Sequence, residues 1–458
     1  MKSKIDVKKS FYLSLLLVSL FSLNVTVSRA QSYPPSCVIT VPFNNAYFKA
    51  GTDVEIHVYA TDFGKSANNG TVTSVEFFNG SHSLSKVTKQ TNYTYTFIWK
   101  NVQAGTYTLK AKAINNKGVE FNSVGVIITV GSKDVTSLGL SAGKGKYLAN
   151  ILQPKVSANY DTYWNGATSE NACKWGMMEA TRGVMTYENA DNAYNYAKDR
   201  NMMFRYHAGV WASQFPQWLL SLSIEEAKAE VVKRLQMIAE RYPLSDQIDL
   251  LNEQLGNHQK DNQKFRELFG GPGTKPEDYG WQIWLFEQGR KYLPNTKLVL
   301  NDYGLEGDTK SIKSQLELFK VLRDRGLVDG FGTQAHAFNV DKPTADTIKS
   351  SLNLMATSGL PIFVTELDMN GGLKGRQQAN DSLQLISYKK AFPVFWEHPA
   401  VAGITLWGYI QNTTWMTGTG IVSKDGVENP SMVWLKSYLA SKPIVGYPMY
   451  ATKKGTDK

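Results

Sequence analysis

The chain has 458 residues, of which 42% are hydrophobic and 20% charged, as in soluble globular proteins with room for two or three domains. Its net charge is +10, but no basic block is interleaved with aromatic residues, which argues against nucleic-acid binding. Beyond the first 30 residues no stretch is apolar enough to span a bilayer, so we expect no membrane span in the mature chain.

The first 30 residues are typical of a secretory signal peptide. Four lysines precede a Leu-rich apolar run at 11–23, and Ser28-Arg29-Ala30 offers a small-x-small cleavage signal. The alternative is an N-terminal membrane anchor, against which the shortness of the apolar run argues. We therefore expect a bacterial protein that is secreted, periplasmic or held at the cell surface.

Residues 31–131 are predicted to form an all-β domain. Apolar and polar residues alternate at 54–60, 93–99 and 107–113, and turn signals such as Asn79-Gly80 separate these runs. The pattern resembles the immunoglobulin-like modules that precede exported bacterial hydrolases. The aromatic stripe at 93–99 is interpreted as sandwich core, with carbohydrate binding as the alternative.

From about residue 140 the pattern changes to short apolar strands that alternate with amphipathic helices, which predicts a parallel sheet. The clearest helices are expected at 224–240 and 311–325. Eight such strands fit an α/β fold, a closed (β/α)8 TIM barrel. We place the strands near 147–151, 166–170, 202–207, 248–253, 297–302, 330–335, 361–366 and 403–407.

The predicted domains are a signal peptide at 1–30, an Ig-like sandwich at 31–131, a linker at 132–143, the barrel at 144–442 and a mobile tail at 443–458. Because the barrel should have its own core, we expect that removing residues 31–131 spares its activity. Cys37 and Cys173 fall in different domains, so we expect two lone buried thiols and no metal framework.

Two apolar runs, each of which ends in a carboxylate, indicate a catalytic site. They are 248–253, which ends at Glu253, and 361–366, which ends at Glu366. Carboxylates at the ends of barrel strands lie where active sites are built. A pair of them supplies the acid and the nucleophile that cleavage of a glycosidic bond requires.

Polar and aromatic side chains also follow nearly all of the remaining predicted strands. Amide, carboxylate and ammonium groups suit sugar hydroxyls, and Trp and Tyr stack on the apolar faces of sugar rings. In strand order the set is Glu170, Asn171 and Lys174; His207, Trp211 and Gln214; Asn252 and Glu253; Asn301 and Tyr303; Gln334 and His336; Glu366; and Trp407 and Trp415.

Seven motifs stand in order at these strand ends. They are Thr168-Ser-Glu-Asn-Ala-Cys-Lys-Trp175, His207-Ala-Gly-Val-Trp211, Asn252-Glu253, Asn301-Asp-Tyr303, Gly332-Thr-Gln-Ala-His336, Thr365-Glu-Leu-Asp368 and Trp407-Gly408. Together they resemble glycoside hydrolase family 10, the retaining endo-β-1,4-xylanases, over residues 145–440. The resemblance implies an enzyme that acts on xylan or a related β-glycan without a metal ion or organic cofactor, and we expect a monomer.

The resemblance also implies roles. Glu253 would be the general acid/base and Glu366 the nucleophile, with their carboxyl groups about 5–5.5 Å apart. Asn252 would bind the sugar 2-hydroxyl, and Gln334 and His336 would position Glu366. The resemblance implies that His207 and Lys174 line the same sugar, and that Glu170, Asn171 and Gln214 lie one ring further toward the non-reducing end. It also implies that Trp407 and Trp415 cover these rings. Asn301 and Tyr303 would face the leaving group.

The sequence departs from the family pattern in three places. Ala212, Gly304 and Gln411 stand where the family usually has His, Asn and Asp. The segment between the first and second strands also looks short. These departures leave open a mixed-linkage xylan or β-1,4-glucan specificity, because one or two side chains can decide it. A non-catalytic polysaccharide-binding protein is the alternative of a different class, against which the two carboxylates weigh.

Overall fold

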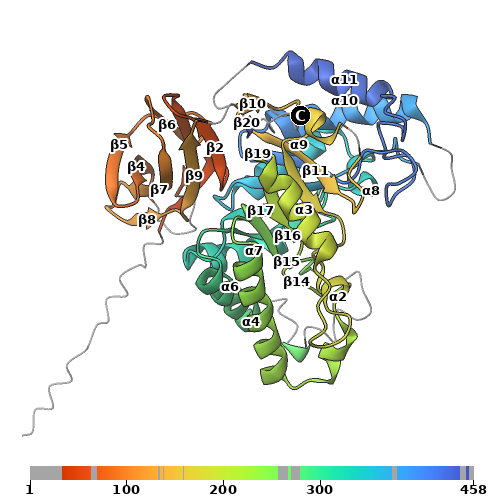
Figure 1. Cartoon of the computed structure of the whole chain (residues 1–458), viewed down its shortest axis with the longest axis horizontal. Helices are drawn as coiled ribbons and strands as arrows, with labels where there is room; N and C mark the ends of the chain where they lie inside the picture. The colour runs from red at the N-terminus through yellow and green to blue at the C-terminus, as the bar shows by residue number, and fades with distance from the viewer. Residues whose placement is uncertain are drawn as a thin grey trace, which may run out of the picture.

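The computed structural model describes residues 34–62, 70–132, 135–137, 139–157, 159–255, 267–269, 279–373, 379–443 and 450–452. Figure 1 shows a β-sandwich, in red and orange, beside a larger barrel whose strands are surrounded by helices. The signal peptide predicted at 1–30 and most of the tail predicted at 443–458 lie outside the described residues. Among the helices of the described part, none is both long and apolar enough to cross a membrane.

The N-terminal domain is a sandwich of two sheets, as the alternating pattern predicts. One sheet has the order β1 (Ser36–Val41), β3 (Val54–Thr61) and β6 (Thr94–Trp99). The other has the order β2 (Ala46–Lys49), β9 (Val126–Gly131), β7 (Gly105–Asn115), β4 (Val72–Asn79) and β5 (His82–Val87), with β8 (Glu120–Asn122) beside β7. Tyr95 of the aromatic stripe is 2% exposed and donates a hydrogen bond to the Val72 carbonyl, so this residue belongs to the core.

The second domain is a closed parallel barrel, as predicted. Its strands, in chain order, are β11 (Tyr147–Leu152), β12 (Gly166–Ser169), β13 (Met203–Tyr206), β14 (Val210–Trp211), β15 (Gln247–Asn252), β16 (Lys297–Asp302), β17 (Gly330–Thr333), β18 (Ile362–Leu367) and β19 (Val401–Leu406). β19 pairs with β11, and β13 pairs with β15, so the sheet closes on itself. The eight predicted strands are therefore confirmed to within about two residues, with the two-residue β14 added.

Helices surround the barrel and separate its strands. The long ones are α3 (Glu188–Asp199), α4 (Ile224–Arg241), α6 (Gly280–Tyr292), α7 (Thr309–Asp324), α9 (Ala345–Ala356), α10 (Asp381–Glu397) and α11 (Pro430–Ala440). Short ones are α1 (Tyr160–Tyr163), α2 (Trp175–Met178), η1 (Gln217–Ser221) and α8 (Ala337–Val340), and a further strand pair joins β10 (Val135–Ser137) to β20 (Tyr450–Thr452). The helix predicted at 224–240 begins with a capping box in which Ser223 and Glu226 satisfy each other's backbone N–H groups.

The sandwich packs against the base of the barrel, where the strands begin. The backbone N–H of Asn44 donates to Asp246 Oδ1 at 2.7 Å, and the N–H of Tyr47 donates to Asn201 Oδ1 at 2.8 Å. Thr61 Oγ1 donates to the carbonyl of Gly359 at 2.6 Å. These contacts fix several points of the sandwich to loops that precede barrel strands.

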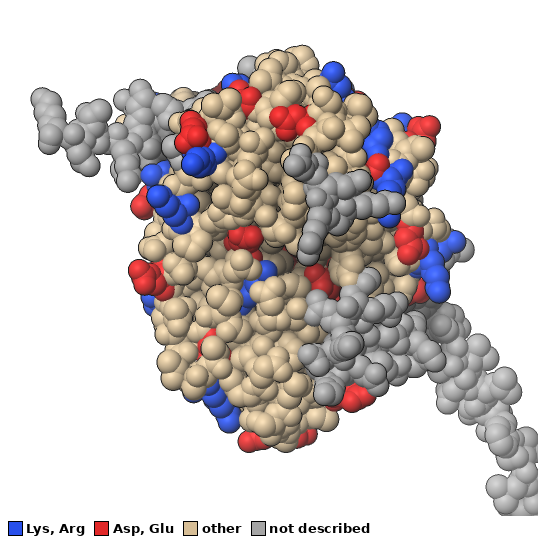
Figure 2. Space-filling view, turned by 90° about the vertical axis from the view of Figure 1, so that its right-hand side faces the viewer, with Lys and Arg blue, Asp and Glu red and all other residues tan. Residues whose placement is uncertain are grey.

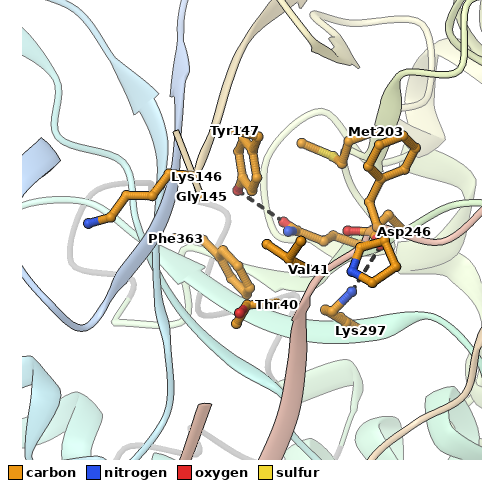
Figure 3. Close-up of a pocket in the computed structure, with 12 residues that line it drawn as sticks. Thr40, Val41, Gly145, Lys146, Tyr147, Met203, Asp246, Lys297 and Phe363 are labelled. Carbon is orange, nitrogen blue, oxygen red and sulfur yellow. Dashed lines mark hydrogen bonds and ion pairs between the residues drawn. The ribbon is translucent and has the colours of Figure 1, made fainter. Parts of the chain in front are cut away.

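Apolar side chains of both domains form one core at this junction (Figure 3). Val41 lies near Tyr147 and Phe363, and the cavity that these three residues help to line is only about 20 Å³. The buried core of the sandwich extends without interruption to Tyr147, Met203 and Phe363. Beside these apolar residues, Lys297 Nζ and Asp246 Oδ1 form an ion pair of 2.9 Å that is almost fully buried. The barrel has a core of its own, as expected, but the core of the sandwich continues into the base of the barrel. The effect of removing residues 31–131 stays a prediction.

Removal of residues 31–131 should destabilise the barrel. The deletion would expose Tyr147, Met203 and Phe363 to water, and each buried side chain of this kind contributes about 1.5–3 kcal/mol. We expect denaturant titration to show a loss of at least about 3 kcal/mol in the free energy of unfolding, or an insoluble barrel. An isolated barrel that unfolds at the same denaturant concentration as the full chain would contradict the shared core.

Candidate active site

The polar residues predicted at strand ends gather on the face of the barrel away from the sandwich. Figure 2 looks onto this side of the molecule and shows a central hollow that contains both acidic and basic side chains. Most other Lys, Arg, Asp and Glu side chains in this view lie nearer the outline of the molecule. In a closed parallel barrel the carboxyl ends of all strands meet at one end, which is where we place the hollow.

Glu253 follows β15 and is held in a left-handed backbone conformation, with φ 56°. Such a conformation costs a non-glycine residue about 1–2 kcal/mol, and it persists where the surroundings determine it. Here the Glu253 N–H donates to the Asn301 carbonyl at 2.8 Å. This backbone turn therefore sets the direction in which the Glu253 side chain leaves the end of the strand.

Glu366 lies on β18 and has two polar partners. Asn301 Nδ2 donates to Glu366 Oε1 at 2.9 Å, and His336 Nε2 lies 3.4 Å from Glu366 Oε2. Burial would raise the pKa of this carboxyl, but the positive charges of His207, His336 and Arg205 lower it to about 2. Glu366 is therefore an ionised carboxylate at neutral pH.

Glu253 has the opposite electrostatic environment. Burial raises its pKa, and the negative charge of Glu366 raises it further. Two neutral side chains bind it: Gln334 Nε2 donates to Glu253 Oε1 at 3.1 Å, and Trp211 supplies another hydrogen bond. These bonds and the charge of His207 lower the Glu253 pKa, but burial, the largest cause, leaves it raised. Two carboxyl groups in one hollow thus have pKa values that move apart, which is the arrangement of an acid next to a nucleophile.

His336 is held by an aspartate that belongs to the same strand end as Glu366. Asp368 Oδ2 lies 3.1 Å from His336 Nδ1 and also accepts a hydrogen bond of 2.8 Å from Trp415 Nε1. Burial opposes a charge on His336, but Asp368 and Glu366 together raise its pKa to about 10. The imidazolium is therefore a fixed positive charge between two carboxylates.

A second charged group lies under the hollow, inside the barrel. Arg205 and Asp249 are both fully buried, 3.4 Å apart, and Asp249 Oδ2 lies 2.8 Å from His207 Nδ1. The Arg205 guanidinium also donates to the carbonyl of Thr365, the residue before Glu366. This network fixes the orientation of His207 and adds positive charge beneath the nucleophile position.

The other predicted residues form the wall of the hollow. Lys174 Nζ donates to Asn171 Oδ1 at 2.7 Å and lies 5.0 Å from the centre of the Trp211 ring. Burial lowers the pKa of Lys174. Trp407 is buried with its ring 5.1 Å from that of His207, whereas Trp415 is 50% exposed.

Three predicted residues lie further out. Glu170 is half-buried, and its Oε2 accepts a hydrogen bond from Gln153 Nε2 at 3.1 Å. Gln214 is exposed, with a left-handed backbone at φ 51°. Tyr303 is half-buried, with its ring 6.1 Å from that of Phe338. These positions are compatible with contacts outside the centre of the hollow.

Two residues lie differently from what the family roles imply. Asn301 is fully buried, and its Nδ2 donates to both Asn252 Oδ1 and Glu366 Oε1, so it supports the carboxylate. This close approach needs Gly332 on β17, where a Cβ atom would lie 2.7 Å from Asn301 Oδ1. The side chain of Gln334 contacts Glu253, and only its backbone carbonyl meets the N–H of Glu366.

The sequence analysis did not select Asp368, Asp249 or Arg205 as site residues. A signal existed for the first, because side chains two apart in an extended segment share a face, and Asp368 is two residues after Glu366. A signal also existed for the other two, because charged residues inside otherwise apolar barrel strands need partners.

Replacing His336 should change the ionisation of Glu366. His336→Gln removes a positive charge next to the carboxylate, so the Glu366 pKa should rise by about 1–3 units toward its ordinary value. Carboxyl ¹³C NMR titration of the folded protein measures this pKa. The matched control is His82→Gln in the sandwich, which should leave Glu366 unchanged. An unaltered Glu366 titration in His336→Gln would contradict the role given to the imidazolium.

Comparisons with known proteins agree with this architecture. The family model described as glycosyl hydrolase family 10 matches residues 130–443, and the model described as bacterial Ig domain matches residues 35–111. Solved structures with a similar fold include GH10 from Paenibacillus barcinonensis (TM-score 0.58, 24% identity, covering 66% of this chain and 97% of that one) and xylanase 10B from Thermotoga maritima (TM-score 0.58, 21% identity, with the same coverage).

Two curated relatives are more similar in sequence. Endo-1,4-beta-xylanase B of Cellvibrio japonicus is 34% identical over 294 residues, which are 63% of this chain and 45% of that protein. Exoglucanase XynX of Acetivibrio thermocellus is 30% identical over 305 residues, 62% of this chain and 27% of that protein. The chain thus spans less than half the length of these two relatives. Because the first family model covers more than half of the chain, this protein belongs to glycosyl hydrolase family 10.

Proposed function

We propose that this protein is an exported endo-acting hydrolase that cleaves the β-1,4-xylosidic bonds of xylan with retention of configuration. The observation that carries the proposal is the opposite displacement of two carboxyl pKa values, downward for Glu366 and upward for Glu253. Retaining glycosidases need one ionised carboxylate as the nucleophile and one protonated carboxyl as the acid.

The proposed reaction gives each carboxyl group one role. The Glu366 carboxylate attacks the anomeric carbon while Glu253 donates its proton to the departing glycosidic oxygen. The sugar is then held as an ester of Glu366, and the leaving chain departs with the proton. Glu253, now a carboxylate, takes a proton from water, and the resulting hydroxide releases the sugar and restores both groups.

A buried hydrogen-bond donor without a partner favours the binding of a sugar next to Glu366. Asn252 is 1% exposed, and its Nδ2 has no hydrogen-bond partner among the described residues, although its Oδ1 accepts from Asn301. A buried N–H group without a partner costs about 1–3 kcal/mol. A sugar hydroxyl bound next to Glu366 would satisfy this donor, which agrees with the 2-hydroxyl contact that family membership implies.

A β-1,4-glucan is the second candidate substrate. Xylose and glucose backbones differ by one hydroxymethyl group, which a site accepts or rejects by steric fit. Ala212 is small and buried where the family usually has His, so this side of the hollow has more room. One relative is also named an exoglucanase. Xylan remains the first candidate, because another relative named a xylanase has the higher identity.

Export is proposed from the sequence of the first 30 residues, with their basic start and apolar run. Fractionation of the producing cells tests it: the mature protein should start near residue 31 and be found outside the cytoplasm. A full-length cytoplasmic protein would contradict export without affecting the proposed reaction.

Replacing Glu366 should abolish turnover while the fold is kept. Glu366→Gln keeps the size of the side chain but removes the attacking charge, so hydrolysis of xylan and of aryl xylobiosides should fall by about a thousandfold or more. Circular dichroism and the melting temperature check the fold. A variant with near-normal rates would exclude Glu366 as the nucleophile.

Replacing Glu253 should affect substrates according to their leaving group. In Glu253→Gln the proton donor is lost, so xylan hydrolysis should slow by about 10²–10⁴-fold. An aryl xylobioside with an acidic phenol needs no protonation, so formation of its glycosyl-enzyme should be much less affected. Initial-burst kinetics on both substrates measure the difference. Equal losses on the two substrates would argue against the acid role.

A further inference from the structure

A groove between the sandwich and the barrel has no assigned role. Its volume of about 1070 Å³ lies at the upper end of the range for ligand pockets. The sandwich lines it with the end of β3 and the starts of β4 and β6, and the barrel lines it with α7, the end of α9 and the loop before β19. Because the segments that lead into β18 and β19 lie at the opposite end of the barrel from the carboxyl ends of the strands, the groove is not part of the hollow.

The aromatic stripe at 93–99 contributes an exposed ring to this groove. Tyr95 of the stripe is buried, whereas Tyr93 is 42% exposed. Tyr93 is the second residue of a two-residue turn, and both turn residues have left-handed backbones, with φ 49° for Asn92 and 64° for Tyr93. Turns of this kind prefer glycine at the second position, so the tyrosine has a steric cost. Such strain clusters at sites that bind ligands, which makes the Tyr93 ring a candidate for a binding role.

A buried hydroxyl group lies next to this ring. Tyr59 lines the same groove, is 2% exposed, and meets the Tyr93 ring edge to face at 6.2 Å and 67°. Within the described part of the chain, its Oη has no hydrogen-bond partner. Leaving a buried polar group without a partner costs free energy, so the site gains when a ligand supplies one. A ligand that carries hydroxyl groups would do so from the groove.

The remaining side chains of the groove indicate a neutral ligand. Two lysines of α7 are balanced by two carboxylates, and the last cation, Arg323, forms an ion pair with Asp324. A balanced lining does not attract a strongly charged polymer. Amide and hydroxyl groups suit sugar hydroxyls, whereas apolar side chains and aromatic rings suit the faces of sugar rings. Both kinds line the groove, the polar ones including Gln90, Thr71, Asn353 and Thr357 and the apolar ones Leu316 and Leu354.

We propose that this groove is a second glycan-binding site, which holds a neutral segment of the xylan chain at a distance from the hollow. The inference rests on the proposed function for the identity of the polymer. Two attachment points on one polymer raise the effective concentration of substrate at the hollow. Because the sandwich and the barrel supply opposite walls of the groove, neither domain contains the complete site.

The test counts the xylohexaose molecules that the full chain binds. Its parent is Glu366→Gln, which should keep the fold and leave the sugar uncleaved. Isothermal titration calorimetry should find two molecules per chain, one in the hollow and one in the groove. Adding Tyr93→Ala should weaken one of the two affinities about tenfold and leave the other unchanged, whereas Tyr93→Phe keeps the ring and should keep both. One molecule per chain in the parent, or two unchanged affinities in Tyr93→Ala, would overturn the proposal.

Two further variants separate binding from a structural effect. Ile98→Ala is the matched control, because Ile98 lies on β6, is 41% exposed and does not line the groove, so both affinities should stay unchanged. Tyr59→Phe removes only the hydroxyl group that has no partner. It should lower the affinity of the groove about threefold or more without lowering the melting temperature. A loss of both affinities in Tyr93→Ala and in Ile98→Ala alike would show a structural effect and overturn the proposal.

Failure of the proposed function gives a different result. If the wild type hydrolyses xylan but the parent variant binds one xylohexaose, only the second site is rejected. If the wild type does not hydrolyse xylan but Tyr93 still contributes to xylohexaose binding, only the proposed function is rejected. Binding of cellohexaose that depends on Tyr93, without such binding of xylohexaose, would overturn xylan as the ligand of the groove.

Discussion

The electrostatic difference between Glu253 and Glu366 is the constraint on which the site depends. Both carboxyl groups are largely buried, and burial alone would favour the protonated form of each. The charges of His336 and Arg205 act on Glu366, whereas the two hydrogen-bond partners of Glu253 described above are neutral. The charge of His207 acts on both carboxyl groups. In the proposed reaction, the neighbours of the two residues therefore decide which carboxyl attacks and which donates a proton.

The charges that stabilise Glu366 are themselves held by buried partners. Asp368 holds His336, and Asp249 holds His207 and lies next to Arg205. Removing one member of a buried charged pair leaves the other uncompensated, so these groups depend on one another. The opposite end of the barrel is covered by the sandwich, whose apolar core continues to Tyr147 and Phe363.

Much of the fold could be predicted from the sequence because buried parallel strands are short apolar runs bounded by polar residues. The strands that carry Glu253 and Glu366 were placed within two residues of their observed limits. His336 lies beside Glu366, as the resemblance implied. The partner of Gln334 could not be predicted, because an amide is compatible with either carboxyl until side-chain directions are known. The packing of the sandwich on the barrel was also missed, since its contacts join residues about 200 positions apart, such as Asn44 and Asp246.

The central claim is that Glu366 attacks the sugar because it is the ionised carboxylate of the pair. The most direct measurement is to treat the wild-type protein with a 2-deoxy-2-fluoro-β-xylobiosyl fluoride and to analyse its peptides by mass spectrometry. The fluorine slows release of the sugar, so the account predicts one xylobiosyl group per chain, attached to Glu366. A label on Glu253, or hydrolysis with inversion and no labelled peptide, would contradict it.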